Sequence, residues 1–140
     1  MRIVVDTNIF LGACLTSGAA NMVLAACLQG HFKPIMGNAL FAAYEDVLGR
    51  EAIFQKSRLS VEERNELFDI FLFGCEWVRV YYQWRPNLRD ESDNHLIELA
   101  VAGNARCIVT RKVRDLASGQ LLFPHIAVLT PEQLPGGFSP

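Results

Sequence analysis

The chain has 140 residues, 51% of them hydrophobic, and a formal net charge of −2. A chain of this length and composition can bury roughly two-thirds of its unfolded surface as one domain, so it needs no disulfides to hold a core. The charge excludes a global attraction to nucleic acid, and any such binding must depend on how the charges are distributed.

Strand-like and helix-like segments alternate along the chain. The patterns predict, in order, a strand at 2–6, helical stretches within 8–29, a strand at 32–36, helices at 38–50 and 60–73, a strand at 77–81, a helix at 92–102, and strands at 107–110 and 126–129. This alternation favours an α/β fold with a parallel sheet and helices on both faces. Residues 1–134 form the predicted single domain, and 135–140, rich in Pro and Gly, a flexible tail.

Two helix ends have local signals. Ser60 followed by Glu63 fits a capping box, which predicts a helix start there. Gly103 and Asn104 are typical of a helix C-terminus and close the predicted helix at 92–102.

The thiols and the apolar runs indicate the compartment. No apolar run approaches the length of a membrane span, and the N-terminus lacks a charged leader with a cleavage site, so we expect a cytoplasmic protein with no membrane contact. The four cysteines, Cys14, Cys27, Cys75 and Cys107, show no spacing of a zinc or dithiol site. They are predicted to be buried thiols in a reducing cytoplasm.

The opening strand ends abruptly in three polar residues, Asp6, Thr7 and Asn8. Parallel strands carry their ligands beyond their carboxyl ends, which makes Asp6 a site candidate. The alternative is that Asp6 and Asn8 only cap a helix beginning near Ile9.

Three carboxylates are expected on one edge of the sheet: Asp6, Asp93 at the start of a helix, and Asp115 beyond Thr110. Such carboxylates repel one another unless a cation lies among them, and their hard oxygens suit Mg²⁺ or Mn²⁺. A cluster of this kind can activate water and neutralise a phosphodiester during hydrolysis. The alternative is that Asp90 and Asp93 only stabilise the first turn of a helix, with Asp115 in a solvent loop.

Several segments resemble the motifs of PIN-domain nucleases. Residues 5–8 look like the first motif, and the stretch from Arg89 to Ala100 resembles the third acidic segment. Residues 107–110 with 114–116 resemble the fourth strand and its loop, and 128–134 match the usual ending. The resemblance covers nearly the whole chain in the right order.

This resemblance implies a three-layer α/β/α sandwich with an acidic divalent-metal site that cuts RNA. Many bacterial relatives are toxins of toxin–antitoxin pairs. By the same similarity Asp6 and Asp93 would be metal ligands, with help from Asp115, and Asn8 would orient a ligand or bound water. The predicted supporting residues are Thr7, Asn8, Asp90 and Thr110.

Two positions depart from the family pattern. Ala43 stands before Tyr44, where the family usually places a glutamate. Glu45 lies about 200° further around the helix, so it would replace the missing acid only in a different helix register. Lys112 stands where relatives commonly carry Asp or Asn, and it would bring a positive charge towards the metal unless it turns outwards to a phosphate. The remaining carboxylates are compatible with a single-ion nuclease.

Basic and aromatic residues supply candidate RNA contacts. Arg85 and Arg89 lie beside Tyr81, Tyr82 and Trp84, a combination that can hold phosphates and stack bases. In the alternative, the aromatics pack inwards from a strand. Arg111 and Lys112 would extend the same RNA track. His95 is read as a helix-surface histidine rather than a general base. The phenylalanines Phe68, Phe71 and Phe73 indicate core or a subunit interface.

The leading functional hypothesis is a Mg²⁺- or Mn²⁺-dependent endoribonuclease with catalytic Asp6, Asp93, Asp115 and Glu45. Its expected partners are RNA, an antitoxin protein that inserts a segment into the acidic groove, and a second copy in a homodimer. A second hypothesis, motivated by Ala43 and Lys112, is a PIN-like module that has lost catalysis and binds RNA or protein. A third is a doubly wound phosphoacceptor domain.

Overall fold

Five parallel strands form the centre of the molecule. The computed structural model describes residues 1–16, 18–57, 59–80, 94–116 and 123–134. The strands are β1 (Arg2–Val5), β2 (Lys33–Met36), β3 (Glu76–Trp77), β4 (Cys107–Val109) and β5 (Ala127–Leu129). Their order in the sheet is β3-β2-β1-β4-β5, and each neighbouring pair is parallel. The predicted parallel α/β architecture is therefore confirmed.

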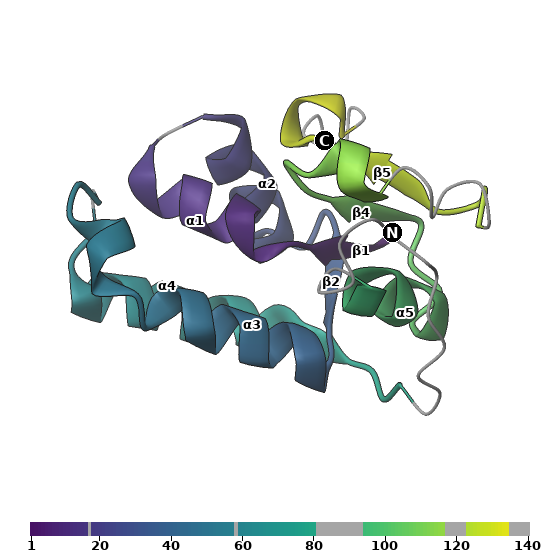
Figure 1. Cartoon of the computed structure of the whole chain (residues 1–140), viewed down its shortest axis with the longest axis horizontal. Coiled ribbons are helices and arrows are strands. Elements are labelled where there is room, and N and C mark those ends of the chain that lie inside the picture. Colours follow the sequence, from purple (N-terminus) through teal and green to yellow (C-terminus); the bar gives the residue numbers. More distant parts are fainter. Residues whose placement is uncertain (17, 58, 81–93, 117–122, 135–140) are drawn as a thin grey trace.

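The helices cover both faces of this sheet. They are α1 (Thr7–Leu15), α2 (Ala19–Leu28), α3 (Asn38–Leu48), α4 (Val61–Gly74) and α5 (Asn94–Ala102). Figure 1 shows α1 and α2 on one side of β1 and α5 on the other, where α5 packs against β1 and β4. The central strands are buried on both faces as a result, which explains their continuous apolar sequences. This arrangement agrees with the expected three-layer sandwich.

The strand order of the sheet reverses between β1 and β4. The chain passes outwards from β1 to β2 and β3, and then returns to the other side of β1 to form β4 and β5. In open α/β sheets, ligands bind beyond the carboxyl ends of the strands at the point where the order reverses. The residues that follow β1 and β4 are therefore placed at the expected ligand site.

Some element boundaries differ from the sequence prediction. Helix α1 begins at Thr7 rather than near Ile9, because Asp6 caps it. Strand β3 has two residues, and the backbone N–H of Val78 adds one further bond to the carbonyl of Met36, 2.8 Å away. Short 3₁₀ turns at Glu51–Phe54 and Pro131–Gln133 were not predicted. The end of the predicted strand at 77–81 and the tail at 135–140 lie outside the described residues.

The structure confirms the predicted start of α4, and it shows that Asn104 rather than Gly103 is the left-handed residue at the end of α5. Ser60 and Glu63 form the reciprocal capping box at the start of α4. At the end of α5 the left-handed residue is Asn104, with φ 54°, whereas Gly103 serves close packing. A Cβ at Gly103 would lie 2.4 Å from Cδ1 of Ile35, so a larger residue would separate α5 from β2.

An aromatic cluster fills the core between α1, α3 and α4. Tyr44 stacks on Phe68 at a centroid distance of 5.1 Å, and Phe10 packs edge-on against both rings at 5.7 Å. Phe71 is 1% exposed and Phe73 is 93% exposed. Phe68 and Phe71 are therefore core residues, and Phe73 is a surface residue. Within the described ranges no single helix is long and apolar enough to cross a membrane.

The cysteines are free thiols, as expected. Cys14, Cys27 and Cys107 are buried, and Cys75 is half-buried. Burial raises the pKa of Cys27 and of Cys75 to about 12 and that of Cys107 to about 11. Because the thiolate is the reactive form, these thiols are unreactive at neutral pH.

Candidate functional site

Asp6 is a buried carboxylate at the carboxyl end of β1. It is 5% exposed, and both of its oxygens accept hydrogen bonds. Oδ1 accepts from the backbone N–H of Thr7 at 2.7 Å, and Oδ2 accepts from Oγ1 of Thr110 at 2.8 Å and from Nδ2 of Asn8 at 3.2 Å. Asp6 is therefore the N-cap of α1, as the alternative interpretation expected, and it also lies at the carboxyl edge of the sheet, where its role in a functional site stays a prediction.

Hydrogen bonds from Thr110 and Asn8 tie the ends of β1 and β4 together. Nδ2 of Asn8 lies 3.3 Å from Oγ1 of Thr110, which also accepts from the backbone N–H of Lys112 at 3.0 Å. Oδ1 of Asn8 accepts from the backbone N–H of Arg111 at 3.1 Å. We call Asp6, Thr7, Asn8 and Thr110 the polar centre. Its oxygen atoms are held in place by these hydrogen bonds at the point where the strand order reverses, between β1 and β4.

Tyr44 holds the end of β1, directly before Asp6, through a hydrogen bond from its hydroxyl. Its side chain is 1% exposed, and its hydroxyl donates to the carbonyl of Val5 at 2.8 Å, one residue before Asp6. Burial, followed by the nearby charge of Asp6, raises its pKa well above the usual value, so the hydroxyl keeps its proton. Sequence analysis missed this role. The available signal was a core-facing tyrosine on α3, because a buried tyrosine hydroxyl usually has a partner.

The other predicted acids are not part of the polar centre in the residues that the structure describes. Glu45 is exposed on α3, and Asp115 is half-buried in a helical turn at 113–116. Among the described residues neither carboxylate has a hydrogen bond to the polar centre. Asp90 and Asp93 lie outside the described residues, as do Arg85 and Arg89. In the ranges that the structure describes, His, Cys, Asp and Glu form no group of three or more that could hold a metal ion.

The two predicted RNA-contacting cations after Thr110 differ in their surroundings. The guanidinium of Arg111 forms an ion pair with both carboxylate oxygens of Glu132, at 2.7 Å from Oε2, and this bond lowers the pKa of Glu132. Lys112 is exposed. Burial lowers the pKa of His95, while the charge of Asp6 raises it and that of Lys112 lowers it.

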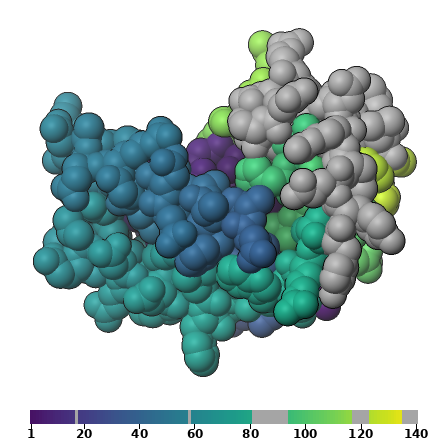
Figure 2. Space-filling model, turned by 60° about the horizontal axis from the view of Figure 1, so that its bottom comes forward, coloured from purple at the N-terminus to yellow at the C-terminus, as the bar shows by residue number. Residues whose placement is uncertain are grey.

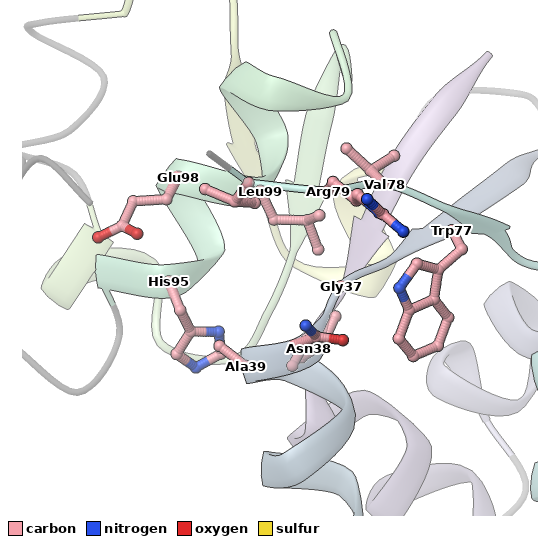
Figure 3. A pocket seen from close by; sticks show the side chains of 11 residues that line it. Gly37, Asn38, Ala39, Trp77, Val78, Arg79, His95, Glu98 and Leu99 are labelled. Atoms are coloured by element: carbon pink, nitrogen blue, oxygen red, sulfur yellow. The ribbon is translucent and has the colours of Figure 1, made fainter. Parts of the chain in front are cut away.

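A pocket of about 530 Å³ opens at the carboxyl ends of β2 and β3, on the edge of the sheet that also carries the polar centre. Its walls come from the start of α3, the residues that follow β2 and β3, and α5. Figure 3 shows His95 on one side, Trp77 on the other and Asn38 between them. In the space-filling view, purple atoms of the N-terminal segment are visible between α3 in blue and the green atoms of the C-terminal half (Figure 2). His95, which we expected on an open helix surface, lines this pocket.

The comparisons with known proteins agree with this geometry. The family model described as the PIN domain matches residues 2–114. The chain belongs to the PIN-domain family. The match includes the polar centre and confirms the resemblance that we drew from the motifs, and it replaces the phosphoacceptor hypothesis.

A solved structure shares the PIN fold of this chain. It is the crystal structure of VapBC2 from Rickettsia felis bound to a DNA fragment from their promoter. The TM-score is 0.60 at 16% sequence identity, and the alignment covers 93% of this chain and 98% of the other. At this identity the likeness concerns the fold. The sequence has no significant match among curated proteins.

Proposed function

We propose that this PIN domain is a metal-dependent endoribonuclease that hydrolyses RNA phosphodiester bonds. The observation that supports this function most directly is the buried carboxylate of Asp6, fixed by Thr110 and Asn8 at the point where the strand order reverses, between β1 and β4. A carboxylate fixed at this point can take part in chemistry on a ligand that enters from solvent.

The donors of the polar centre suit a hard cation. Carboxylate, hydroxyl and amide oxygens are typical ligands of Mg²⁺ and Mn²⁺. Such an ion, when bound, supplies an activated water and neutralises charge on the phosphate. Asp6 would hold it together with Asp93, and Thr7, Asn8 and Thr110 would keep the Asp6 oxygens in place. Mg²⁺ binds with as few as one or two carboxylates plus substrate phosphate, so this residue set fits one ion better than two.

The remaining predicted residues take secondary roles in this proposal. Asp115, which is half-buried, and Glu45, which is exposed, have no hydrogen bond to the polar centre among the described residues. In this proposal they would contribute negative charge near the ion without being its main ligands. Asp90 would be a supporting residue, as the resemblance to the family implies. The RNA-contacting cations would be Arg85, Arg89, Arg111 and Lys112.

Cleavage of a mixed single-stranded RNA pool by purified protein, with Mg²⁺ or Mn²⁺, tests the proposal. We expect cutting that stops when the metal is chelated and that falls at least ~100-fold in Asp6→Asn, since a Mg²⁺ site loses one of its few carboxylates. Asp69→Asn, which changes an exposed carboxylate on α4, is the matched control and should cut normally. Equal cutting by wild type and Asp6→Asn would overturn the assignment.

Two observations favour a second function, an RNA- or protein-binding module without catalysis. Ala43 stands before Tyr44, where the family pattern has an acid, and Lys112 places a positive charge two residues after Thr110, where relatives commonly carry Asp or Asn. The variant with Ala43→Glu and Lys112→Asp separates the two functions. A decayed enzyme should gain activity, whereas an intact single-ion enzyme should change little.

We also propose that the domain works with an antitoxin protein, supported by its family and by the fold it shares with VapBC2. Expression of the chain in a bacterial host should slow growth, and the protein encoded beside it should restore growth. Asp6→Asn should not slow growth. Sedimentation of the chain alone tests the proposed homodimer, and Phe73→Asp should weaken it if the exposed ring is part of the interface.

A further inference from the structure

The pocket at the carboxyl ends of β2 and β3 has the make-up of a nucleobase site. Its lining includes the apolar residues Gly37, Leu40, Val78 and Leu99, together with the buried carboxylate of Glu98. A Cβ at Gly37 would lie 3.1 Å from Cδ1 of Leu99, so the glycine lets the start of α3 approach α5 closely. Its volume of about 530 Å³ falls within the range of small-ligand sites, and its apolar lining residues offer surface against which a flat ring can pack.

An aromatic ring stands at the rim. Trp77 is 50% exposed, and Phe41 packs against it at a centroid distance of 5.7 Å and an interplanar angle of 59°. The indole is therefore held in place by the protein while half of its surface stays open. An exposed ring that is already ordered loses little side-chain entropy when a flat ligand stacks on it.

Polar groups complete the rim of this pocket. The exposed amide of Asn38, at the first position of α3, lies between Trp77 and His95 (Figure 3). An amide presents a donor and an acceptor side by side, which matches the edge of a base. The exposed guanidinium of Arg79 also lines the pocket and can hold a phosphate or stack on a base.

The pocket and the polar centre lie at the carboxyl ends of neighbouring strands. Gly37 and Asn38 line the pocket and follow β2, which pairs with β1, and Asp6 follows β1. Unstacked bases of single-stranded RNA are recognised by stacking on aromatic rings and by hydrogen bonds at their edges. We propose that this pocket binds one nucleobase of single-stranded RNA next to the phosphodiester at the polar centre, with Trp77 stacking and Asn38 reading the base edge.

The proposal takes RNA as the ligand from the proposed nuclease function. Binding of a base to the pocket does not require cleavage, so the test measures binding alone. The chain contains two tryptophans, so the signal of Trp77 is taken as the difference between the wild type and Trp77→Phe, and Trp84 is left unchanged. Nucleoside 5′-monophosphates are titrated in EDTA, with excitation beyond the absorption of the bases. Ribose 5-phosphate, which has the phosphate and sugar but no base, is the comparison ligand.

We expect saturable quenching by at least one nucleotide, at least about tenfold tighter than any response to ribose 5-phosphate, since stacking on an aromatic ring contributes this much per base. Asn38→Ala should weaken nucleotide binding several-fold, and Asn65→Ala, an exposed amide on α4, should leave it unchanged. Equal binding of ribose 5-phosphate, or no nucleotide response, would overturn the proposal. A pocket that takes a protein side chain instead would give that second result.

The two proposals fail separately. If nucleotides bind through their bases but RNA is not cut, the nuclease assignment is wrong and the base site stands. If RNA is cut in a metal-dependent way while nucleotides and ribose 5-phosphate bind alike, only the base site is wrong.

Discussion

The polar centre and the pocket lie along the same edge of the sheet, yet they are built in opposite ways. The polar centre consists of a buried carboxylate whose oxygens are held by short hydrogen bonds from Thr7, Asn8 and Thr110. The pocket is a space between α3, β3 and α5 that is lined by apolar residues and by polar side chains such as the exposed Asn38 and Arg79. Changes at the polar centre should therefore affect stability strongly, whereas changes at the pocket should affect binding more than stability.

The largest expected effect comes from Asp6→Ala. The substitution removes the cap of α1 and leaves the donors of Thr7, Asn8 and Thr110 without their acceptor, which should cost about 2–4 kcal/mol in the free energy of unfolding. Urea unfolding measures this difference. Asp69→Ala, which removes an exposed carboxylate, is the control and should cost far less. A loss no larger than that of the control would show that the hydrogen bonds do not stabilise the centre.

Tyr44→Phe should have the next largest effect. Its hydroxyl is the donor to the carbonyl of Val5, and its removal leaves a buried acceptor without that bond, at a cost of about 1–2 kcal/mol. The ring contacts with Phe10 and Phe68 remain. Thermal unfolding measures the loss, and nucleotide binding at the pocket should stay unchanged. Weaker nucleotide binding in this variant would mean that the two regions are coupled.

Gly37→Ala should weaken nucleotide binding while changing the stability little, the opposite of what we expect for Tyr44→Phe. The new methyl group would lie 3.1 Å from Cδ1 of Leu99 and 3.4 Å from the carbonyl of Val78, so it narrows the part of the pocket that Gly37 lines. A small shift of Leu99 accommodates it, and the stability should fall by less than about 1 kcal/mol. Trp77 fluorescence should report clearly weaker nucleotide binding. Unchanged binding would show that the nucleotide does not reach the part of the pocket that Gly37 lines.

The smallest expected effect is that of Glu132→Gln, and it depends on pH. Arg111 lowers the pKa of Glu132 below 4.5 in the folded protein, so the ion pair stabilises the fold above that pH and its contribution is lost as the pH falls through the lowered value. The pair is exposed, so salt should weaken it. Glu132→Gln should be slightly less stable than wild type at neutral pH and equal to it in acid.

The same variant sharpens the proposed role of Arg111. Without its carboxylate partner the guanidinium is available to phosphate, so Glu132→Gln should bind single-stranded RNA more tightly at low salt. Adding Arg111→Gln should remove that gain. If Glu132→Gln binds RNA no better than wild type, Arg111 does not contact RNA.

Much of the fold could be predicted from the sequence because it depends on local patterns. The apolar run of β1 and its abrupt polar end placed Asp6 at the carboxyl edge of a parallel sheet, and Ser60 with Glu63 fixed the start of α4. Periodicity and capping signals act over a few residues, so they appear in the sequence itself. Order along the chain does not give order in the sheet, however, and the reversal between β1 and β4 belongs to that spatial order.

The sequence by itself determined the parallel α/β class, the family motifs and the candidate Asp6. Only the tertiary structure decided what surrounds this residue. The bond from Thr110 to Asp6 joins residues 104 positions apart, the bond from Tyr44 to Val5 spans 39, and Glu132 reaches Arg111 from the end of the domain. The pocket combines three separate segments in the same way. Such contacts depend on strand order and helix packing, which bring distant residues together without leaving a local pattern in the sequence.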